Sequence, residues 1–191
     1  MNKIEQLIQI HCPKGVEWKK AGEVVEVITG GEAPDGCIKG GEPTDVCKYP
    51  IYANGVDVYG YADNYKISVD AVTISSIGAN TGTVYFRKAY FSPIIRLKVL
   101  IPKTESLVAK YLFYYLSSIK IESKKSSVPN MNADDVKKIL IPIPPLPVQQ
   151  EIVSILDKFT ELEAELEAEL EARRKQYEYY REKLLTFEKN K

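Results

Sequence analysis

The chain has 191 residues, and its 26 Lys and Arg balance 26 Asp and Glu, so its formal net charge is zero. No apolar run approaches the roughly 20 residues that a membrane span needs, and the start lacks the apolar region of a signal peptide. Three cysteines without a CxxC pair and one histidine, His11, without neighbouring ligands indicate a reducing, cytoplasmic location and no metal site.

The sequence pattern in the first half of the chain predicts short strands separated by loops. Residues 1–20 form an amphipathic lead that ends in a loop, and the alternation over 23–30 predicts a strand. The segment 31–48 contains four glycines, two prolines and no hydrophobic period. We expect a long loop there, and ordered loops of this length are usually functional. Further β-rich segments follow at 49–54, 56–62, 70–78, 82–92 and 93–102.

A glycine-rich stretch at 78–82 lies between two of these segments, which predicts a hairpin turn and not a phosphate-binding loop that opens a helix. The pattern then predicts a helix over 104–120 that Thr104 opens. Asn132 is expected to cap a short helix over 133–138, and a strand follows at 139–144. The prolines between Pro142 and Pro147 are expected to end this domain.

Residues 148–187 show a helical period without Gly or Pro. At about 1.5 Å per residue this helix is roughly 60 Å long. Three ELEA tetrapeptides occupy 161–172 and interrupt a strict heptad. From composition alone this stretch also fits a solvated Glu-rich helix, but the apolar stripe indicates a partner helix. The predicted stripe consists of Ile152, Ile155, Phe159, Leu162, Leu166, Leu170, Tyr177, Tyr180, Leu184 and Phe187.

The fold class expected is therefore α+β: a mixed, β-rich domain over 1–147 followed by a long coiled-coil helix over 148–191. The charge divides in the same way. Residues 1–147 hold 18 Lys and Arg against 15 Asp and Glu, whereas residues 148–191 hold 8 against 11. A net of +3 on the domain supports DNA affinity only through a local basic face.

Catalytic motifs are sparse. There is no Walker A loop, no GxGxxG motif and no methyltransferase-type Asn/Asp-Pro-Pro-aromatic segment. A PD…ExK nuclease assembles on paper from 34–35 and 122–124, but these groups are distant in sequence and lie in unrelated loops. We therefore expect no catalytic residue in this chain.

Recognition of DNA is the chemistry that the polar loops favour. Amide, hydroxyl and basic side chains suit phosphate contacts and base edges, although core packing of the tyrosines and a solvated lysine turn are the plainer alternatives. The predicted contact loops are 31–48, 52–59, 79–83 and 124–130. The candidate DNA-binding residues are Lys39, Tyr52, Asn54, Tyr59, Asn80, Thr81, Thr83, Lys124, Lys125, Ser126 and Asn130.

Several segments together resemble the specificity (S) subunits of type I restriction–modification systems. These are 12–31 (CPKGVEWKKAGEVVEVITGG), 49–55 (YPIYANG), 75–85 (SSIGANTGTVY) and 127–159, and the tail 171–187 (EARRKQYEYYREKLLTF) resembles the end of the family's spacer helix. That family pattern has two recognition domains and two long helices. The present sequence shows one of each, and so it resembles half an S subunit or the product of a truncated or rearranged gene.

The resemblance implies a non-catalytic DNA-specificity subunit. Its implied partners are double-stranded DNA, methyltransferase (M) subunits that bind S-adenosylmethionine, and a motor–nuclease (R) subunit. No cofactor is expected in this chain itself. The long helix would pair with that of a second copy, giving a homodimer, or with a full-length S subunit. The rival interpretations are a coiled-coil adaptor that does not read DNA, and the metal-dependent nuclease.

Overall fold

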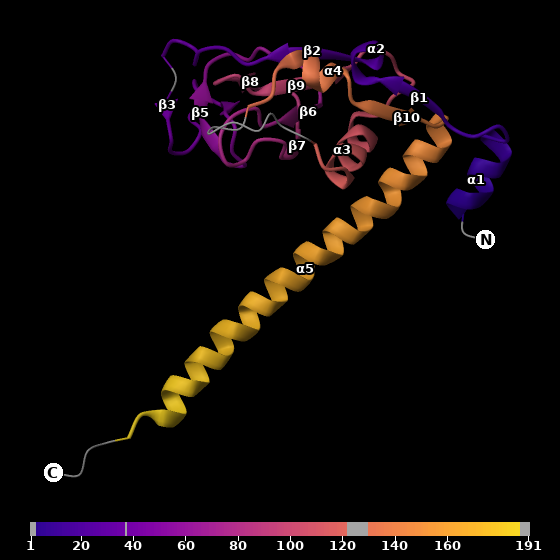
Figure 1. Cartoon of the computed structure of the whole chain (residues 1–191). Helices are drawn as coiled ribbons and strands as arrows, with labels where there is room; N and C mark the ends of the chain where they lie inside the picture. Colours follow the sequence, from indigo (N-terminus) through magenta and orange to yellow (C-terminus); the bar gives the residue numbers. More distant parts are fainter. Residues whose placement is uncertain (1–2, 37, 122–129, 188–191) are drawn as a thin grey trace. The chain divides into compact units, whose positions relative to one another are not determined.

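The computed structural model describes residues 3–36, 38–121 and 130–187, and it has the α+β fold class that the sequence predicts. The chain divides into two compact units, residues 1–153 and 154–191. The first unit holds three sheets and the shorter helices (Figure 1). The second unit consists of the larger part of one helix.

The central sheet of the first unit is antiparallel, with strand order β2-β9-β6-β7. Its strands are β2 (Val25–Thr29), β6 (Ala71–Ile74), β7 (Val84–Arg87) and β9 (Lys98–Pro102). Every residue of β6 is buried, because a central strand covered on both faces offers no position to water. β6 and β7 pair directly across the glycine turn at 78–82, which confirms the predicted hairpin.

A second four-stranded sheet has the order β3-β5-β4-β8. It contains β3 (Ile38–Lys39), β4 (Tyr49–Tyr52), β5 (Val58–Ala62) and β8 (Ser92–Pro93). A two-stranded sheet pairs β1 (Glu17–Lys20) with β10 (Leu140–Ile143). In Figure 1, β1, β10 and α3 lie at one end of this unit, and β3 and β5 lie at the other.

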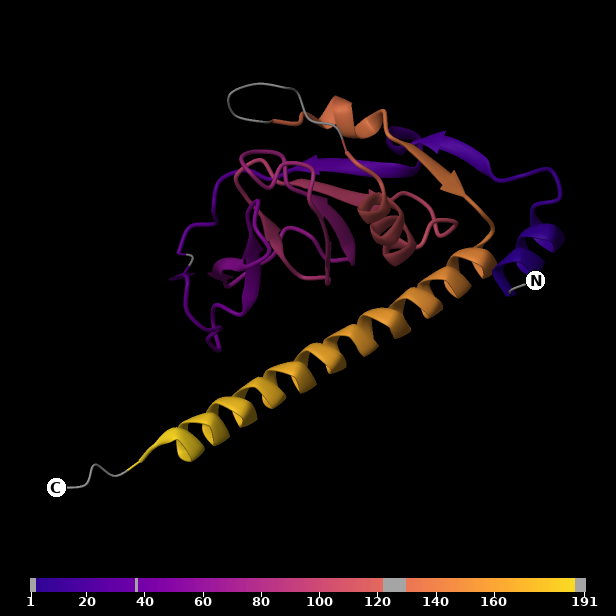
Figure 2. The same cartoon turned by 60° about the horizontal axis from the view of Figure 1, so that its bottom comes forward.

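Four sequence predictions in the β-rich part need correction. Two expected loops contain strands: β1 lies in the loop predicted at the end of 1–20, and β3 lies in the predicted loop 31–48, because each pairs with a strand distant in sequence. The expected strand 23–30 begins only at Val25, because α2 (Ala21–Val24) precedes it and packs against α4 (Ala133–Lys137; Figure 2). The β-rich segment 93–102 is interrupted after β8. There Ile95 and Arg96 adopt positive φ angles of 50° and 60°, and the chain turns before β9.

The predicted helix 104–120 is shorter than expected. α3 spans Ala109–Ser118, and Val108, not Thr104, is its N-cap. The reason is a tertiary contact that sequence periodicity does not reveal. The buried Gln149 side chain accepts a hydrogen bond from the Val108 amide at 2.9 Å and donates to the Ser106 carbonyl at 2.8 Å. A side chain of the long helix therefore holds the N-cap residue in place, where the N-cap side chain makes no capping bond of its own.

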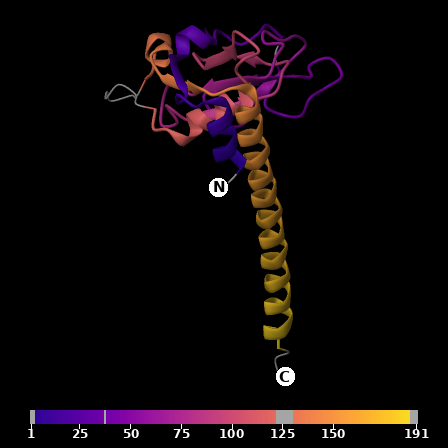
Figure 3. The same cartoon turned by 90° about the vertical axis from the view of Figure 1, so that its right-hand side faces the viewer.

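The main hydrophobic core lies between α3 and the central sheet and includes Leu100, Leu112, Leu116 and Val136. Asn132 caps α4 as predicted, with its side chain accepting from the Asp135 amide in a capping box. The helix α1 (Lys3–His11) lies beside the first turns of the long helix (Figure 3). Lys3 forms a 2.6 Å ion pair with Glu151 there.

The long helix α5 runs unbroken from Leu146 to Leu185 over 40 residues. It starts two residues earlier than predicted, since Pro147 fits a first helical turn, where no amide partner is needed. It also ends before Phe187. At about 1.5 Å per residue the helix is roughly 60 Å long. Among the described residues, no helix is both long enough and apolar enough to cross a membrane.

Candidate nucleic-acid interface

The loop after β4 is joined to two other loops through the amide of Asn54. Its Nδ2 donates to the Ile95 carbonyl at 2.6 Å, and its Oδ1 accepts from the Ser76 amide at 2.7 Å. The Ser75 hydroxyl also donates to the Asn54 carbonyl at 2.6 Å. Segments far apart in sequence therefore meet here. We call the segments 53–57, 75–83, 94–98 and 130–132 the loop cluster.

The glycine turn contributes the next predicted candidates to this cluster. The Thr81 hydroxyl donates to the Gly78 carbonyl at 2.6 Å. Asn80 and Thr83 are exposed, and so their side chains are available to a partner. Asn130 is also exposed, and its backbone forms a bridge with Ile77. The cluster thus combines Asn54, the candidates on the turn, and Asn130.

The turn at 94–97 is the strained part of the cluster. The Leu97 amide donates to the Ile94 carbonyl at 3.1 Å, with left-handed backbone at both central residues. A β-branched residue rarely adopts such a φ angle. The conformation is held by two amide hydrogen bonds, from Ile95 to Gly31 and from Arg96 to Gly30. Strain of this kind persists where surrounding contacts enforce it, and it concentrates at functional sites.

Tyr52 is half-buried, and its ring packs on Phe91 and against a cation. The Arg87 guanidinium lies 3.8 Å from the Tyr52 ring centre and 4.7 Å from that of Tyr85. It donates to the carbonyls of Gly55 and Val56 at 2.8 and 2.9 Å. Burial lowers the pKa of Arg87, although charge interactions with Tyr52, Tyr85 and Asp57 oppose this. Arg87 therefore holds the 53–57 loop in place.

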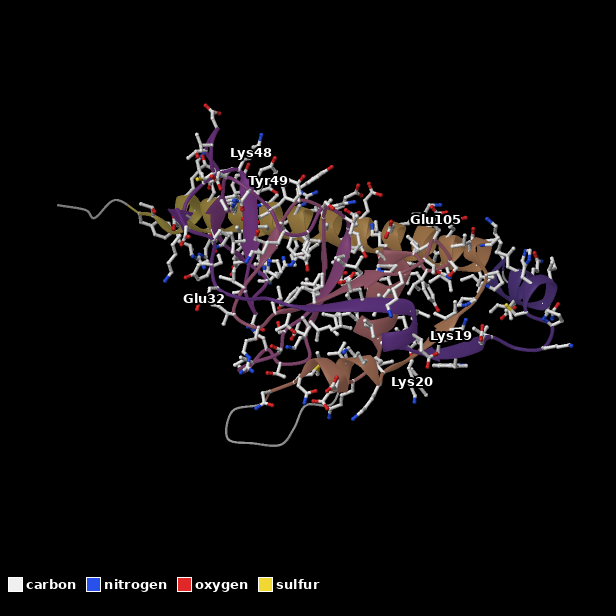
Figure 4. All side chains as sticks on the ribbon, turned by 90° about the horizontal axis from the view of Figure 1, so that it is seen from above. Lys19, Lys20, Glu32, Lys48, Tyr49 and Glu105 are labelled. Carbon is white, nitrogen blue, oxygen red and sulfur yellow. The ribbon has the colours of Figure 1, made fainter. Side chains whose placement is uncertain are left out.

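Lys39 and Tyr59 meet on the second sheet, apart from the hydrogen bonds of the loop cluster. The Lys39 ammonium lies 5.3 Å from the Tyr59 ring centre, and β3 pairs with β5 beside them. Other basic side chains are dispersed. Figure 4 shows Lys19 and Lys20 together on β1, and Lys48 next to Tyr49 in a different part of the unit.

Sequence reasoning missed three cations of this region: Arg96 and Lys98 in the loop cluster, and Arg87 beside it. Each lies within or beside a β-rich segment, where alternation assigns it no special role. The consecutive positive φ angles at Ile95 and Arg96 carry no sequence signal, since neither residue is Gly or Asn. The candidates Lys124, Lys125 and Ser126 lie outside the described residues, so their role stays a prediction.

The predicted stripe on α5 changes character along the helix. Ile152 and Ile155 are half-buried, whereas the members from Phe159 onward are exposed by 49% or more. Phe159, Leu162, Leu166 and Leu170 line a shallow apolar groove together with Glu163 and Glu167. Phe187 is 79% exposed and lies beyond the helix end. A contiguous exposed apolar surface of this kind indicates a binding surface.

Comparison with known proteins identifies the family. Residues 13–172 match the family model described as the type I restriction modification DNA specificity domain. This chain belongs to that family. The match covers the β-rich unit together with the ELEA repeats, and it agrees with the predicted resemblance. The family domain is the specificity component of these systems, in line with the prediction of a non-catalytic chain.

Individual relatives support the same assignment. A protein of Mycoplasma pneumoniae named as a type I specificity subunit is 31% identical over 172 residues, covering 86% of this chain and 46% of its own length. A Haemophilus influenzae protein named as a type I restriction enzyme specificity subunit is 31% identical over 91% of this chain and 47% of its own. The chain therefore spans about half the length of these relatives.

Solved structures show the same fold. A chain from a study of complex assembly in a type I restriction–modification system aligns with a TM-score of 0.65 and 25% identity, over 92% of this chain and 48% of that one. The S subunit of M. genitalium aligns with a TM-score of 0.63 and 21% identity, over 88% and 46% of the two chains.

Proposed function

We propose that this chain is a sequence-specific DNA-recognition subunit of a type I restriction–modification complex, and that it reads a bipartite target as a pair of recognition domains. The observation that carries the proposal is the family match over 13–172. The loop cluster supports it from the residues upward. Exposed Asn80, Thr83 and Asn130 lie on braced loops, and such side chains read base edges in the major groove.

In this proposal, the hydrogen bonds that fix the loops to one another have a physical purpose. A loop that reads bases must hold its polar groups in one arrangement before DNA arrives, because ordering it on binding costs affinity. Asn54, Arg87 and the turn at 94–97 provide this order through the hydrogen bonds described above. Asn54, whose amide is already bonded inside the protein, supports the reading surface and does not itself face bases.

The exposed stripe on α5 would be covered by a second copy of this chain. An antiparallel pair is favoured by a symmetry in the sequence. A two-fold axis between Glu171 and Ala172 places Leu166 beside Tyr177 of the other copy and Phe159 beside Leu184. The same axis places Glu163 within one residue of Arg181. Because an interface about a two-fold axis is self-complementary, each pair occurs twice.

Two recognition domains in such a dimer would read two half-sites about one helical turn apart, ~34 Å, or a multiple of it. If the copies are identical, the half-sites form an interrupted inverted repeat. Methyltransferase subunits that bind S-adenosylmethionine, and a motor–nuclease subunit, would supply the chemistry. This chain would determine which DNA sequence the complex recognises.

Selection of DNA from a random pool tests the proposal, with the full chain assembled on its methyltransferase subunit. The enriched pool should contain a two-part motif, and the affinity for that motif should exceed the affinity for unrelated DNA by at least 10³-fold, roughly the lower limit for specific binders. Matched selections without this chain should enrich nothing. A chain that assembles but enriches no motif would favour the alternative, a coiled-coil adaptor.

A further inference from the structure

A small polar cleft opens within the loop cluster. It is lined by residues of three segments, and its volume is about 130 Å³. Four waters occupy a similar volume at ~30 Å³ each in the liquid, so a single phosphate group fits. The lining residues are Ser76, Ile77, Arg96, Lys98, Asn130, Met131 and Asn132.

Two cations line this cleft without a compensating acid. The Lys98 side chain belongs to a residue only 4% exposed, and its ammonium donates to the Thr29 hydroxyl at 3.1 Å. Arg96 is exposed. Within the described part of the chain, neither cation forms an ion pair with a carboxylate, and no acidic residue lines the cleft. Buried charges are normally paired, so the arrangement calls for an anion.

Electrostatics at Lys98 agree with that reasoning. Burial, followed by the nearby Arg96 guanidinium, lowers the pKa of the Lys98 ammonium. Both causes disfavour the charged form in the free protein. An anion between the two cations would offset both, since it supplies opposite charge to each of them.

The cleft is built before any ligand arrives. The Ser76 hydroxyl donates to the Arg96 carbonyl at 2.6 Å, and the Met131 amide donates to the Ser76 carbonyl at 2.9 Å. The three lining segments are therefore fixed to one another. The left-handed backbone at Arg96 is held by the Ser76 bond and by the amide bonds to Gly30 and Gly31, so the fold fixes the point from which the exposed Arg96 side chain extends at the cleft.

We propose that this cleft binds one phosphate of the DNA backbone, with Arg96 and Lys98 as its cationic ligands. The inference rests on the proposed function and adds an anchoring site to it. Asn130 lines the cleft, and the turn with Asn80 begins directly after Ile77. A phosphate held here would therefore fix the register in which these side chains meet base edges, since backbone contacts position a protein and base contacts specify the sequence.

The salt dependence of DNA binding tests the anchor. The assembled full-length protein is compared with Arg96→Gln and Lys98→Met, and exposed Lys66→Gln, which lies outside the cleft, serves as the control. Each cleft variant should lower affinity by about tenfold on target and unrelated DNA alike, and should reduce the slope of log K against log salt by about 1. Lys66→Gln should change neither quantity.

Replacing a DNA phosphate by an uncharged backbone linkage provides a second test. A methylphosphonate at one position in each half-site should weaken wild-type binding and should have no further effect on Arg96→Gln. Arg96→Asn provides a second variant, since Asn tolerates left-handed backbone. Lys98→Met should raise the melting temperature of the free chain, because it removes a buried uncompensated charge.

Two outcomes would overturn the inference. In one, the cleft variants bind DNA with the affinity and salt slope of the wild-type protein, while the wild-type protein still selects its target. The other is stabilisation of the wild-type chain by inorganic phosphate, lost in Lys98→Met, without any change in DNA affinity; this would assign the cleft to a free oxyanion. Failure of the proposed function is distinct from both, because the wild-type protein would then select no motif.

Discussion

Arg87 shows how a single buried side chain can hold a surface loop, here 53–57, in place. It lies on a strand of the central sheet, yet its hydrogen bonds are made to the carbonyls of Gly55 and Val56. The same guanidinium lies against the rings of Tyr52 and Tyr85. A buried residue can therefore set the shape of the loop surface that we propose for DNA recognition.

We expect Arg87→Lys to weaken discrimination between DNA sequences. A lysine keeps the charge but loses the planar, two-pronged hold on the loop. The free energy of unfolding should fall by about 2 kcal/mol, and the ratio of target to unrelated affinity should fall by at least tenfold. Denaturant unfolding and competition binding measure the two quantities. Lys88→Arg, on the adjacent exposed residue, is the matched control, and equal discrimination by both variants would refute this role.

Single residues also show where sequence reasoning stops. Asn54, Asn80 and Asn130 were predicted from their chemistry, and the structure places all three in one cluster. Arg96 and Lys98 were not predicted, because their meaning depends on a turn that follows from contacts with Gly30, Gly31 and Ser76. Residue type predicts which side chains suit DNA, whereas tertiary contacts decide which of them share a surface.

The sequence predicts which helices and strands form better than it predicts where each of them begins and ends. The β6–β7 hairpin, the capped α4 and the long α5 were all expected. The start of α3 was not, since Gln149, some forty positions later in the chain, holds its N-cap residue Val108. Local patterns predict periodicity well, but they cannot predict a contact made by a residue of another element.

The ELEA repeats in α5 make the helix a candidate ruler. Deleting one repeat should shorten it by about 6 Å, close to two base pairs at ~3.4 Å each. The stripe keeps its face, because four residues make little more than one turn of 3.6. The methylated target should therefore keep its half-sites and gain a shorter spacer. Glu165→Lys, which preserves the length of the helix, should leave the spacer unchanged. If the deletion also leaves the spacer unchanged, the helix is not a ruler.

The whole molecule is proposed to act as an antiparallel pair, and its charges make that arrangement testable. Glu163→Arg places two arginines together in each of the two symmetric contacts near Ala172, so the dimer dissociation constant should rise by roughly tenfold or less, as for exposed pairs. Adding Arg181→Glu should restore dimerisation. Analytical ultracentrifugation of both variants measures this. A parallel pair predicts no rescue, since these residues then lie far apart along the rod.

Sequence specificity is the central claim, and a modified-base map of genomic DNA tests it most directly. Cells that express the cognate methyltransferase subunit are compared with and without this chain. The account predicts a methylated, interrupted palindrome that appears only when the chain is present. An asymmetric two-part motif would keep the specificity role but replace the homodimer with a mixed pair. Identical maps from the two cultures, with all proteins expressed and soluble, would contradict the account.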